Sequence, residues 1–144
     1  MYRLRFDLRG PGHTPAQRAD LYEAALEMAA WVDVRECAGI VVSEHHAADD
    51  GYLPAPLTFA AALTAVTRRT PILVGAAIVP LHDPVRLAEE MVVLDHLSRG
   101  RVSYTLALGY RPVEYELYGV DWARRSAVAD EKLAALLGHL RGAP

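Results

Sequence analysis

The chain has 144 residues, 52 % of them hydrophobic, and carries a formal net charge of −3 with an isoelectric point near 6.0. This length suits one domain with its own core, and the acidic balance excludes the basic surface of a typical nucleic-acid-binding protein. The longest apolar run, residues 72–81, is too short to span a membrane, the first residues lack the apolar segment of a signal peptide, and Cys37 has no second cysteine to pair with. We therefore expect one soluble, cytoplasmic domain over residues 1–144 that binds neither nucleic acid nor membrane.

The beginning of the chain predicts a strand, a helix and a second strand. Residues 2–8 alternate apolar and polar side chains, as a short strand does. Thr14, Pro15 and Gln17 then provide an N-cap, a proline in the first helical position and the second half of a capping box, which together predict a helix start. Residues 39–43 form a short apolar run that is typical of a buried parallel strand. The residues expected on the apolar face of the helix are Leu21, Ala25, Met28 and Val32.

The middle of the chain repeats this pattern. Residues 56–68 predict an Ala-rich helix, and residues 72–79 predict a second continuous apolar strand. Asp83 and Pro84 mark the start of another helix, and Gly100 follows its end, where a left-handed backbone is usual. The residues that share the apolar face of this helix are Leu87, Met91 and Leu94.

The last part predicts a fourth strand over residues 101–108, a polar loop, and a helix over residues 126–140. Four alternations of strand and helix favour right-handed βαβ units in a parallel sheet of sequential order, with the helices on the outer side. Both an open doubly wound sheet and part of a (β/α) barrel fit this pattern, although no nucleotide-binding GxGxxG or P-loop follows a strand. Apolar candidates for the inner face of the sheet are Val41, Leu73, Ile78 and Val102, and candidates for the core side of the last helix are Leu133, Leu136, Leu137 and Leu140.

Polar residues gather where strands lead into helices, at residues 43–46, 79–83 and 108–111. In parallel α/β folds these junctions carry the functional side chains. An imidazole of His45 or His46 could exchange protons near neutral pH, but from the residues alone a pair of polar loop residues satisfied by backbone carbonyls is the simpler interpretation. We reject a metal site, because neighbours on an extended segment point to opposite sides and no spaced second ligand completes a shell.

Four segments, read together, resemble the bacterial luciferase-like monooxygenase family: SEHH, DDGYLPAP, VPLHDPVRLAEEMVVLDHLSRGR and LGYRPVEYELYGVDWARR. The similarity runs nearly from end to end, with the segments in the order and spacing of the family. It implies a TIM-type (β/α)8 barrel that binds reduced FMN, or in some branches a deazaflavin coenzyme, at its C-terminal mouth. Four of the eight βα units are present, so we expect a half barrel, apparently truncated on the C-terminal side.

The resemblance also assigns roles to individual residues. The family's catalytic histidine is the first of the pair and maps onto His45. The third strand, often with a strained peptide, packs against the flavin ring, and its small residues would let the ring approach the backbone. The cofactor-binding residues implied are Glu44, Gly75, Ala76, Ala77 and Tyr110, and the substrate-pocket residues are His46 and Tyr52. Without the resemblance, Tyr110 could as well close the mouth of the strands.

These roles predict a flavin-dependent monooxygenase that activates O2 on reduced FMN and acts on a small-molecule substrate, often with a separate flavin reductase. One alternative is a non-catalytic half barrel or interaction module, and a second is a deazaflavin-dependent oxidoreductase. Open edges at the first and fourth strands and an apolar inner face would favour a homo-oligomer, most simply a two-fold dimer.

Overall fold

A computed structural model describes residues 2–142 and contains one four-stranded sheet. Its strands are β1 (Leu4–Phe6), β2 (Ile40–Val42), β3 (Ile72–Ile78) and β4 (Val102–Ala107). They lie in the order β1-β2-β3-β4, and every neighbouring pair is parallel. The sequential order confirms the predicted βαβ units and is that of a (β/α) barrel rather than of a doubly wound sheet, in which the order reverses.

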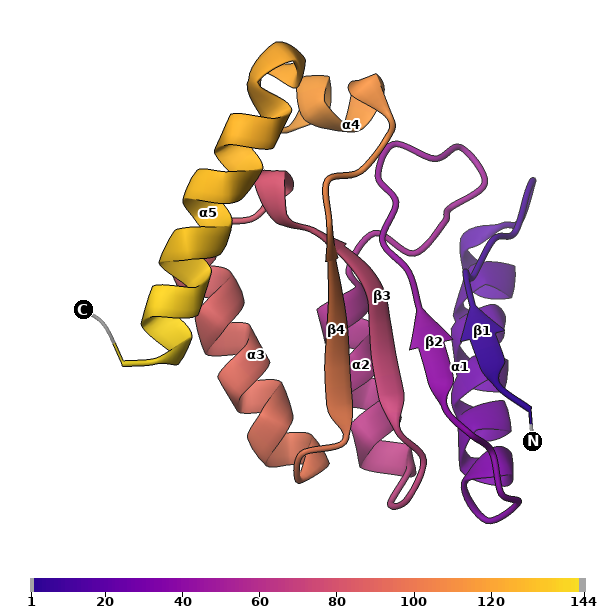
Figure 1. The fold of residues 1–144 in the computed structure, drawn as a ribbon. Helices are drawn as coiled ribbons and strands as arrows, with labels where there is room; N and C mark the ends of the chain where they lie inside the picture. Colours follow the sequence, from indigo (N-terminus) through magenta and orange to yellow (C-terminus); the bar gives the residue numbers. More distant parts are fainter. Residues whose placement is uncertain (1, 143–144) are drawn as a thin grey trace.

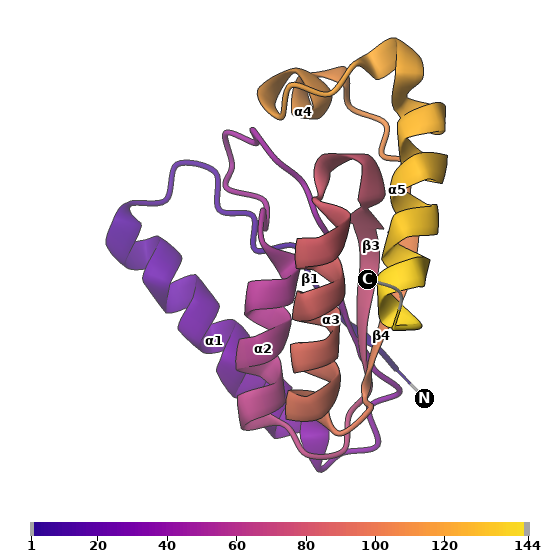
Figure 2. The same ribbon diagram turned by 90° about the vertical axis from the view of Figure 1, so that its left-hand side faces the viewer.

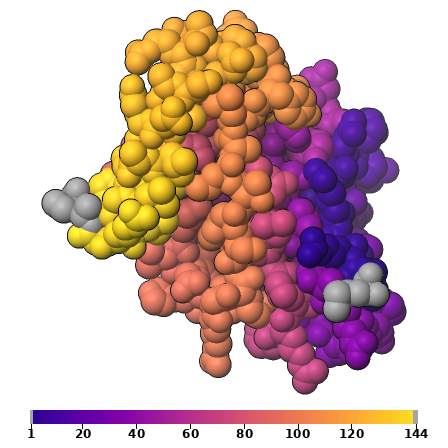
Figure 3. Space-filling model, viewed as in Figure 1, coloured from indigo at the N-terminus to yellow at the C-terminus, as the bar shows by residue number. Residues whose placement is uncertain are grey.

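The helices cover one face of the sheet. In Figures 1 and 2, α1, α2 and α3 lie side by side behind the strands, and α5 runs along α3 at the β4 end. Figure 3 shows the opposite face, where no helix lies over the strands. The helices are α1 (Pro15–Asp33), α2 (Pro56–Val66), α3 (Pro84–Ser98), α4 (Pro112–Leu117) and α5 (Arg125–Leu140), with 3-10 turns η1 (Val79–Leu81) and η2 (Trp122–Arg124). Four of the eight units of a barrel are therefore present.

The predicted helix boundaries have the expected hydrogen bonds. The Thr14 hydroxyl accepts from the Gln17 backbone, and the Gln17 side chain accepts from the Thr14 backbone, so the capping box is complete. The Asp83 carboxylate accepts from the Arg86 backbone at the start of α3. Gly100 follows the end of α3 with a φ of 79°, in the left-handed region. The last helix is fixed to η1 by Lys132, whose Nζ donates to the carbonyl oxygen of Pro80 at 2.7 Å.

The pleat of the sheet decides which strand residues meet the helices. Ile40, Ile72 and Val102 are paired across the sheet, and this row packs into the core between sheet and helices. Alternate residues form the uncovered face, where Arg5, Val41, Leu73 and Ser103 lie in one row. Val102 is thus on the helix side, and its predicted place on the inner face is wrong. Ile78 is buried under Tyr115 of α4. The uncovered face is mixed in polarity, because Arg5 and Ser103 lie in one row with Val41 and Leu73.

Three other expectations need correction. Met28 is half exposed, because the buried positions of α1 are Ala25, Ala29 and Val32. The segment predicted as a polar loop between β4 and the last helix contains α4 and η2. In α5 only Leu136 is fully buried, whereas Leu137 and Leu140 are partly exposed at the surface. Within residues 2–142, no helix combines the length and apolar character that crossing a membrane requires.

Candidate active site

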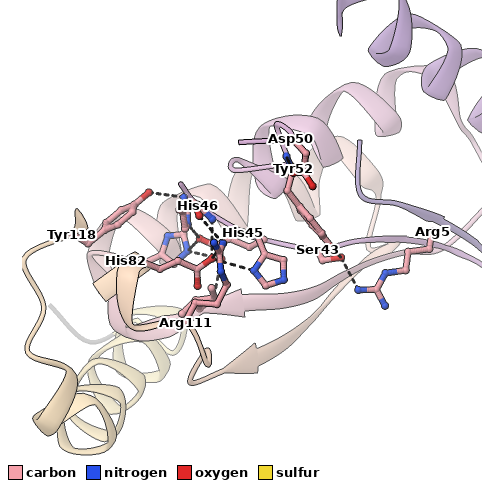
Figure 4. A network of polar contacts seen from close by, with 12 residues as sticks. Arg5, Ser43, His45, His46, Asp50, Tyr52, His82, Arg111 and Tyr118 are labelled. Atoms are coloured by element: carbon pink, nitrogen blue, oxygen red, sulfur yellow. Dashed lines mark hydrogen bonds and ion pairs between the residues drawn. The ribbon is translucent and has the colours of Figure 1, made fainter. Parts of the chain in front are cut away.

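The candidate site lies at the carboxyl end of the sheet, where three loops meet. Residues 43–53 follow β2, η1 and His82 follow β3, and residues 108–118 follow β4 and include α4. Figure 4 shows His45, His46, His82 and Tyr118 gathered there, with Tyr52, Ser43 and Arg5 on the other side of His45. Parallel strands bring their carboxyl ends to the same edge, so residues far apart in the sequence meet at this point.

Glu44 is the centre of one hydrogen-bond network and is almost completely buried, with 2 % of its surface exposed. One carboxylate oxygen lies 2.7 Å from His46 Nε2 and 2.9 Å from His82 Nε2, and the other accepts from the Ile78 backbone N–H at 2.7 Å. Burial by itself would raise the pKa of this carboxyl group. The hydrogen bonds from the two imidazoles and the Ile78 N–H outweigh it and lower the pKa to about 2.

His46 is held at both ring nitrogens and is buried. Nε2 faces the Glu44 carboxylate, and Nδ1 lies 2.9 Å from the hydroxyl of Tyr118. Since an ionised carboxylate only accepts, Nε2 donates to it, and in the neutral imidazole Nδ1 then accepts from Tyr118. His46 therefore belongs to the framework of the loop, and both of its ring nitrogens are already in use.

His45 is held at one ring nitrogen only. Its Nδ1 lies 3.1 Å from Oε1 of Glu114, while the hydrogen bonds of residues 2–142 leave Nε2 without a partner. The ring meets Tyr52 edge to face with centroids 4.4 Å apart, and Tyr110 at 5.5 Å. An imidazole with one nitrogen fixed and the other available has the arrangement of a general acid or base.

Glu114 was not predicted from the sequence, yet it joins the loops after β2 and β4. It is fully buried in α4, and its Oε1 accepts from the His46 backbone N–H at 2.9 Å and from Arg111 Nη1 at 3.1 Å. Arg111 also donates to the carbonyl oxygen of His46 at 2.7 Å. The only feature of the sequence that indicated Glu114 was its position two residues after Pro112, because this places a carboxylate in the first turn of a helix.

The three small residues of β3 do not share one surface. Gly75 pairs with Thr105 and Ala77 with Leu106, so Ala76 is the extra residue of a bulge, and the Gly75–Ala76 peptide bond is cis. Gly75 and Ala76 are partly exposed, but Ala77 is fully buried in the core. Because Gly75 has no side chain, the strand presents bare backbone here. A Cβ at this position would stand 3.4 Å from the side chain of Leu73, in ordinary contact.

Two tyrosines complete the surroundings of His45. The hydroxyl of Tyr52 lies 3.2 Å from Oγ of Ser43, which also accepts from Arg5 Nη2 at 3.0 Å. Tyr110 is 72 % exposed. The structure thus brings Tyr52 and Tyr110 to His45, and it buries the side chains of Glu44 and His46 within the same loop. Among residues 2–142, no group of three or more His, Cys, Asp or Glu side chains is arranged to hold a metal ion.

Comparison with known sequences identifies relatives over much of the chain. The family model of luciferase-like monooxygenases matches residues 3–144. The chain is 34 % identical over 115 residues to 4-hydroxyprotoasukamycin monooxygenase of Streptomyces nodosus subsp. asukaensis, covering 78 % of this chain and 31 % of that protein. It is 31 % identical over 96 residues to limonene 1,2-monooxygenase of Rhodococcus erythropolis, covering 67 % of this chain and 25 % of the relative. The chain therefore spans less than a third of the length of these relatives.

Solved structures agree with this assignment. The monooxygenase RslO1 from Streptomyces bottropensis matches with a TM-score of 0.85 and 28 % identity, over 96 % of this chain and 42 % of that one. The oxygenating constituent of 3,6-diketocamphane monooxygenase from Pseudomonas putida, solved with FMN, has a TM-score of 0.83 over 94 % of this chain and 37 % of that one, and at 21 % identity it shows a shared fold alone. With a family model that extends over nearly all residues and a half barrel of the same architecture, the chain belongs to the luciferase-like monooxygenase family.

Proposed function

We propose that this chain provides one side of a flavin site in a monooxygenase, with His45 as its acid/base residue. The observation that carries the proposal is the free Nε2 of His45 at the carboxyl end of the sheet, with Nδ1 held by a buried carboxylate. Monooxygenase activity in relatives and the FMN complex of a structural neighbour support reduced FMN as the cofactor. The reaction would consume O2 and a small-molecule substrate, and a separate reductase would supply the reduced flavin.

The shape of β3 fits a flat ring. Gly75 has no side chain, Ala76 has a single methyl group, and both are partly exposed at the bulge. Leu73 and Val41 lie beside Gly75 and offer apolar contact. Ala77 could contribute only its backbone, because its methyl group is in the core. Reduced FMN, when bound there, supplies the electrons for oxygen activation.

The protein residues have separate tasks in this proposal. His45 takes or gives a proton at Nε2, and Tyr52 and Tyr110 pack edge to face against its ring and limit its orientation. Glu44 and His46 touch neither cofactor nor substrate directly; they hold the loop that carries His45. This differs from the direct contacts that the family resemblance implied for Glu44 and His46.

Flavin binding by this chain tests the proposal. Gly75→Val adds a branched side chain where the ring would lie, and we expect the Kd for FMN to rise at least about tenfold in a fluorescence titration, in line with the cost of overpacking. Ala65→Val, on the exposed outer side of α2, is the control and should leave the Kd unchanged. Equal FMN affinities of the Gly75→Val and Ala65→Val variants would show that β3 is not part of the flavin site. A parallel titration that shows tight binding of a deazaflavin coenzyme and none of FMN would favour the oxidoreductase alternative, and binding of neither would favour a non-catalytic module.

A further inference from the structure

We propose that Glu114 is the positioning residue that fixes His45 as the Nδ1–H tautomer, so that the basic nitrogen is always Nε2. Its catalytic meaning rests on the proposed function, but the tautomer itself depends only on the described protein atoms. Glu114 lies 69 residues from His45 in the sequence and reaches it from α4.

The direction of the hydrogen bond follows from the other partners of the same oxygen. Oε1 of Glu114 already accepts the backbone N–H of His46 and an N–H of Arg111, and both of these groups can only donate. An oxygen that faces two donors is an acceptor toward the third group as well. Nδ1 of His45, 3.1 Å away, must therefore carry the hydrogen. A neutral imidazole has one N–H, so Nε2 holds the lone pair.

The carboxylate that imposes this choice is itself immobilised. Glu114 has no exposed surface, and Arg111 connects it to the carbonyl oxygen of His46. The neighbouring Tyr115 is also fully buried, and its hydroxyl donates to the carbonyl oxygen of Leu108, which fixes the start of α4 to the end of β4. A side chain held from both loops cannot turn away from His45, so the tautomer is set by the fold.

The second oxygen of Glu114 makes the proposal more specific. Oε2 is buried and has no hydrogen-bond partner among the described residues. A glutamine could therefore place its amide oxygen at Oε1, where the three donors converge, and its NH2 group at the unpartnered position. Glu114→Gln should keep the Nδ1–H tautomer, whereas Glu114→Met, similar in length but without an acceptor, should lose it.

The experiment is a two-bond 1H–15N correlation spectrum of the 144-residue chain with labelled histidine, at about pH 9, where an ordinary imidazole is neutral. The signal of His45 is assigned by its loss in His45→Gln. We expect a protonated Nδ1 and a bare Nε2 in the unmodified chain and in Glu114→Gln. In Glu114→Met we expect a shift toward Nε2–H, the tautomer that free histidine prefers. Glu116→Met, at an exposed position of the same helix, should leave the signal unchanged.

An Nε2–H signal from His45 in the unmodified chain would overturn the proposal, and this outcome does not depend on whether any variant folds. A folded Glu114→Met chain that retains the Nδ1–H signal would overturn it too. No flavin is added at any stage, so a failure to bind FMN would count against the proposed function and would leave the tautomer result as it is.

Discussion

Each end of the sheet has a carboxylate with a strongly lowered pKa, Glu44 in the loop after β2 and Asp33 at the end of α1, but the partners differ. At the carboxyl end, Glu44 is bound by two imidazoles and one backbone N–H. At the opposite end, the Asp33 carboxylate accepts three backbone N–H groups, from residues 68–70, at 2.8 to 2.9 Å. Burial opposes ionisation of Asp33, yet these three hydrogen bonds lower its pKa to about 2.

This difference separates a carboxylate that only stabilises the fold from carboxylates that are bound to imidazoles. Backbone N–H groups never change protonation, so Asp33 can only fix the turn between α2 and β3. Imidazoles exchange protons near neutral pH, and Glu114, beside the network of Glu44, holds the imidazole of His45, whose Nε2 is available for a reaction. Barrels of this type keep catalysis at the carboxyl ends of their strands and stability at the other end. The prediction is that substitutions at one end change function and stability, and at the other end stability alone.

The largest effect is expected at His45. In any preparation of this protein that turns over a flavin substrate, His45→Ala should lower kcat by about 100-fold or more, because Nε2 of His45 is the proposed site of proton transfer. FMN affinity should change little, since the proposed ring surface is on β3. His96→Ala, at an exposed position of α3, is the matched control. Turnover close to that of the unmodified protein would make the SEHH loop a scaffold only.

A second large effect, on stability rather than on turnover, is expected for Glu44→Gln. One of the two carboxylate oxygens becomes an NH2 group that faces buried donors, and we expect the free energy of unfolding to fall by about 3 kcal/mol in urea denaturation. Glu44 also accepts from the backbone N–H of Ile78 at the end of β3, where the flavin ring is proposed to lie, so flavin affinity should fall as well. Glu116→Gln, on the exposed side of α4, should change neither quantity. A stability loss without any change in flavin binding would contradict the proposed site.

The smallest effect is expected at Asp33, and it should depend on pH. The folded-state pKa of about 2 lies below the ordinary value of 3.8, so the stabilisation is complete above about pH 5 and is lost as the pH falls toward 2. Asp33→Asn should remove about 2 kcal/mol at pH 7 and flatten this part of the stability profile. Asp20→Asn, exposed on the same helix, should leave the profile unchanged. A change in flavin affinity on Asp33→Asn would break the separation between the two ends.

The sequence predicts the features that depend on residues close to one another in the chain. The capping box of Thr14 and Gln17, the N-cap Asp83 and the left-handed Gly100 each follow from neighbouring residues, and all three are confirmed. The strand order follows from the alternation of strand and helix. Glu44, His45 and His46 are indicated by their position directly after a strand. Which of the two histidines keeps an available ring nitrogen depends on the partners that reach each imidazole in the folded chain.

The unpredicted features depend on contacts between distant segments. The bulge at Ala76 shifts the pleat by one residue and turns Ala77 into the core, and no local pattern in a run of small residues reveals such a shift. Helix α4 has six residues, too few for an apolar period to be visible. The role of Glu114 exists only because α4 folds over the loop after β2.

The hydrogen bond between Lys132 and the Pro80 carbonyl has a practical consequence for labelling. Lys132 is the only lysine of the chain, so apart from the N-terminal amino group it is the only target for amine-reactive dyes and cross-linkers. Burial lowers the pKa of its ammonium group, which increases the reactive neutral fraction at a given pH. Acylation would also remove the charge that holds α5 against η1 at 2.7 Å. A fluorophore attached there would report on the edge of the candidate site, in a molecule whose last helix has lost its hydrogen bond to η1.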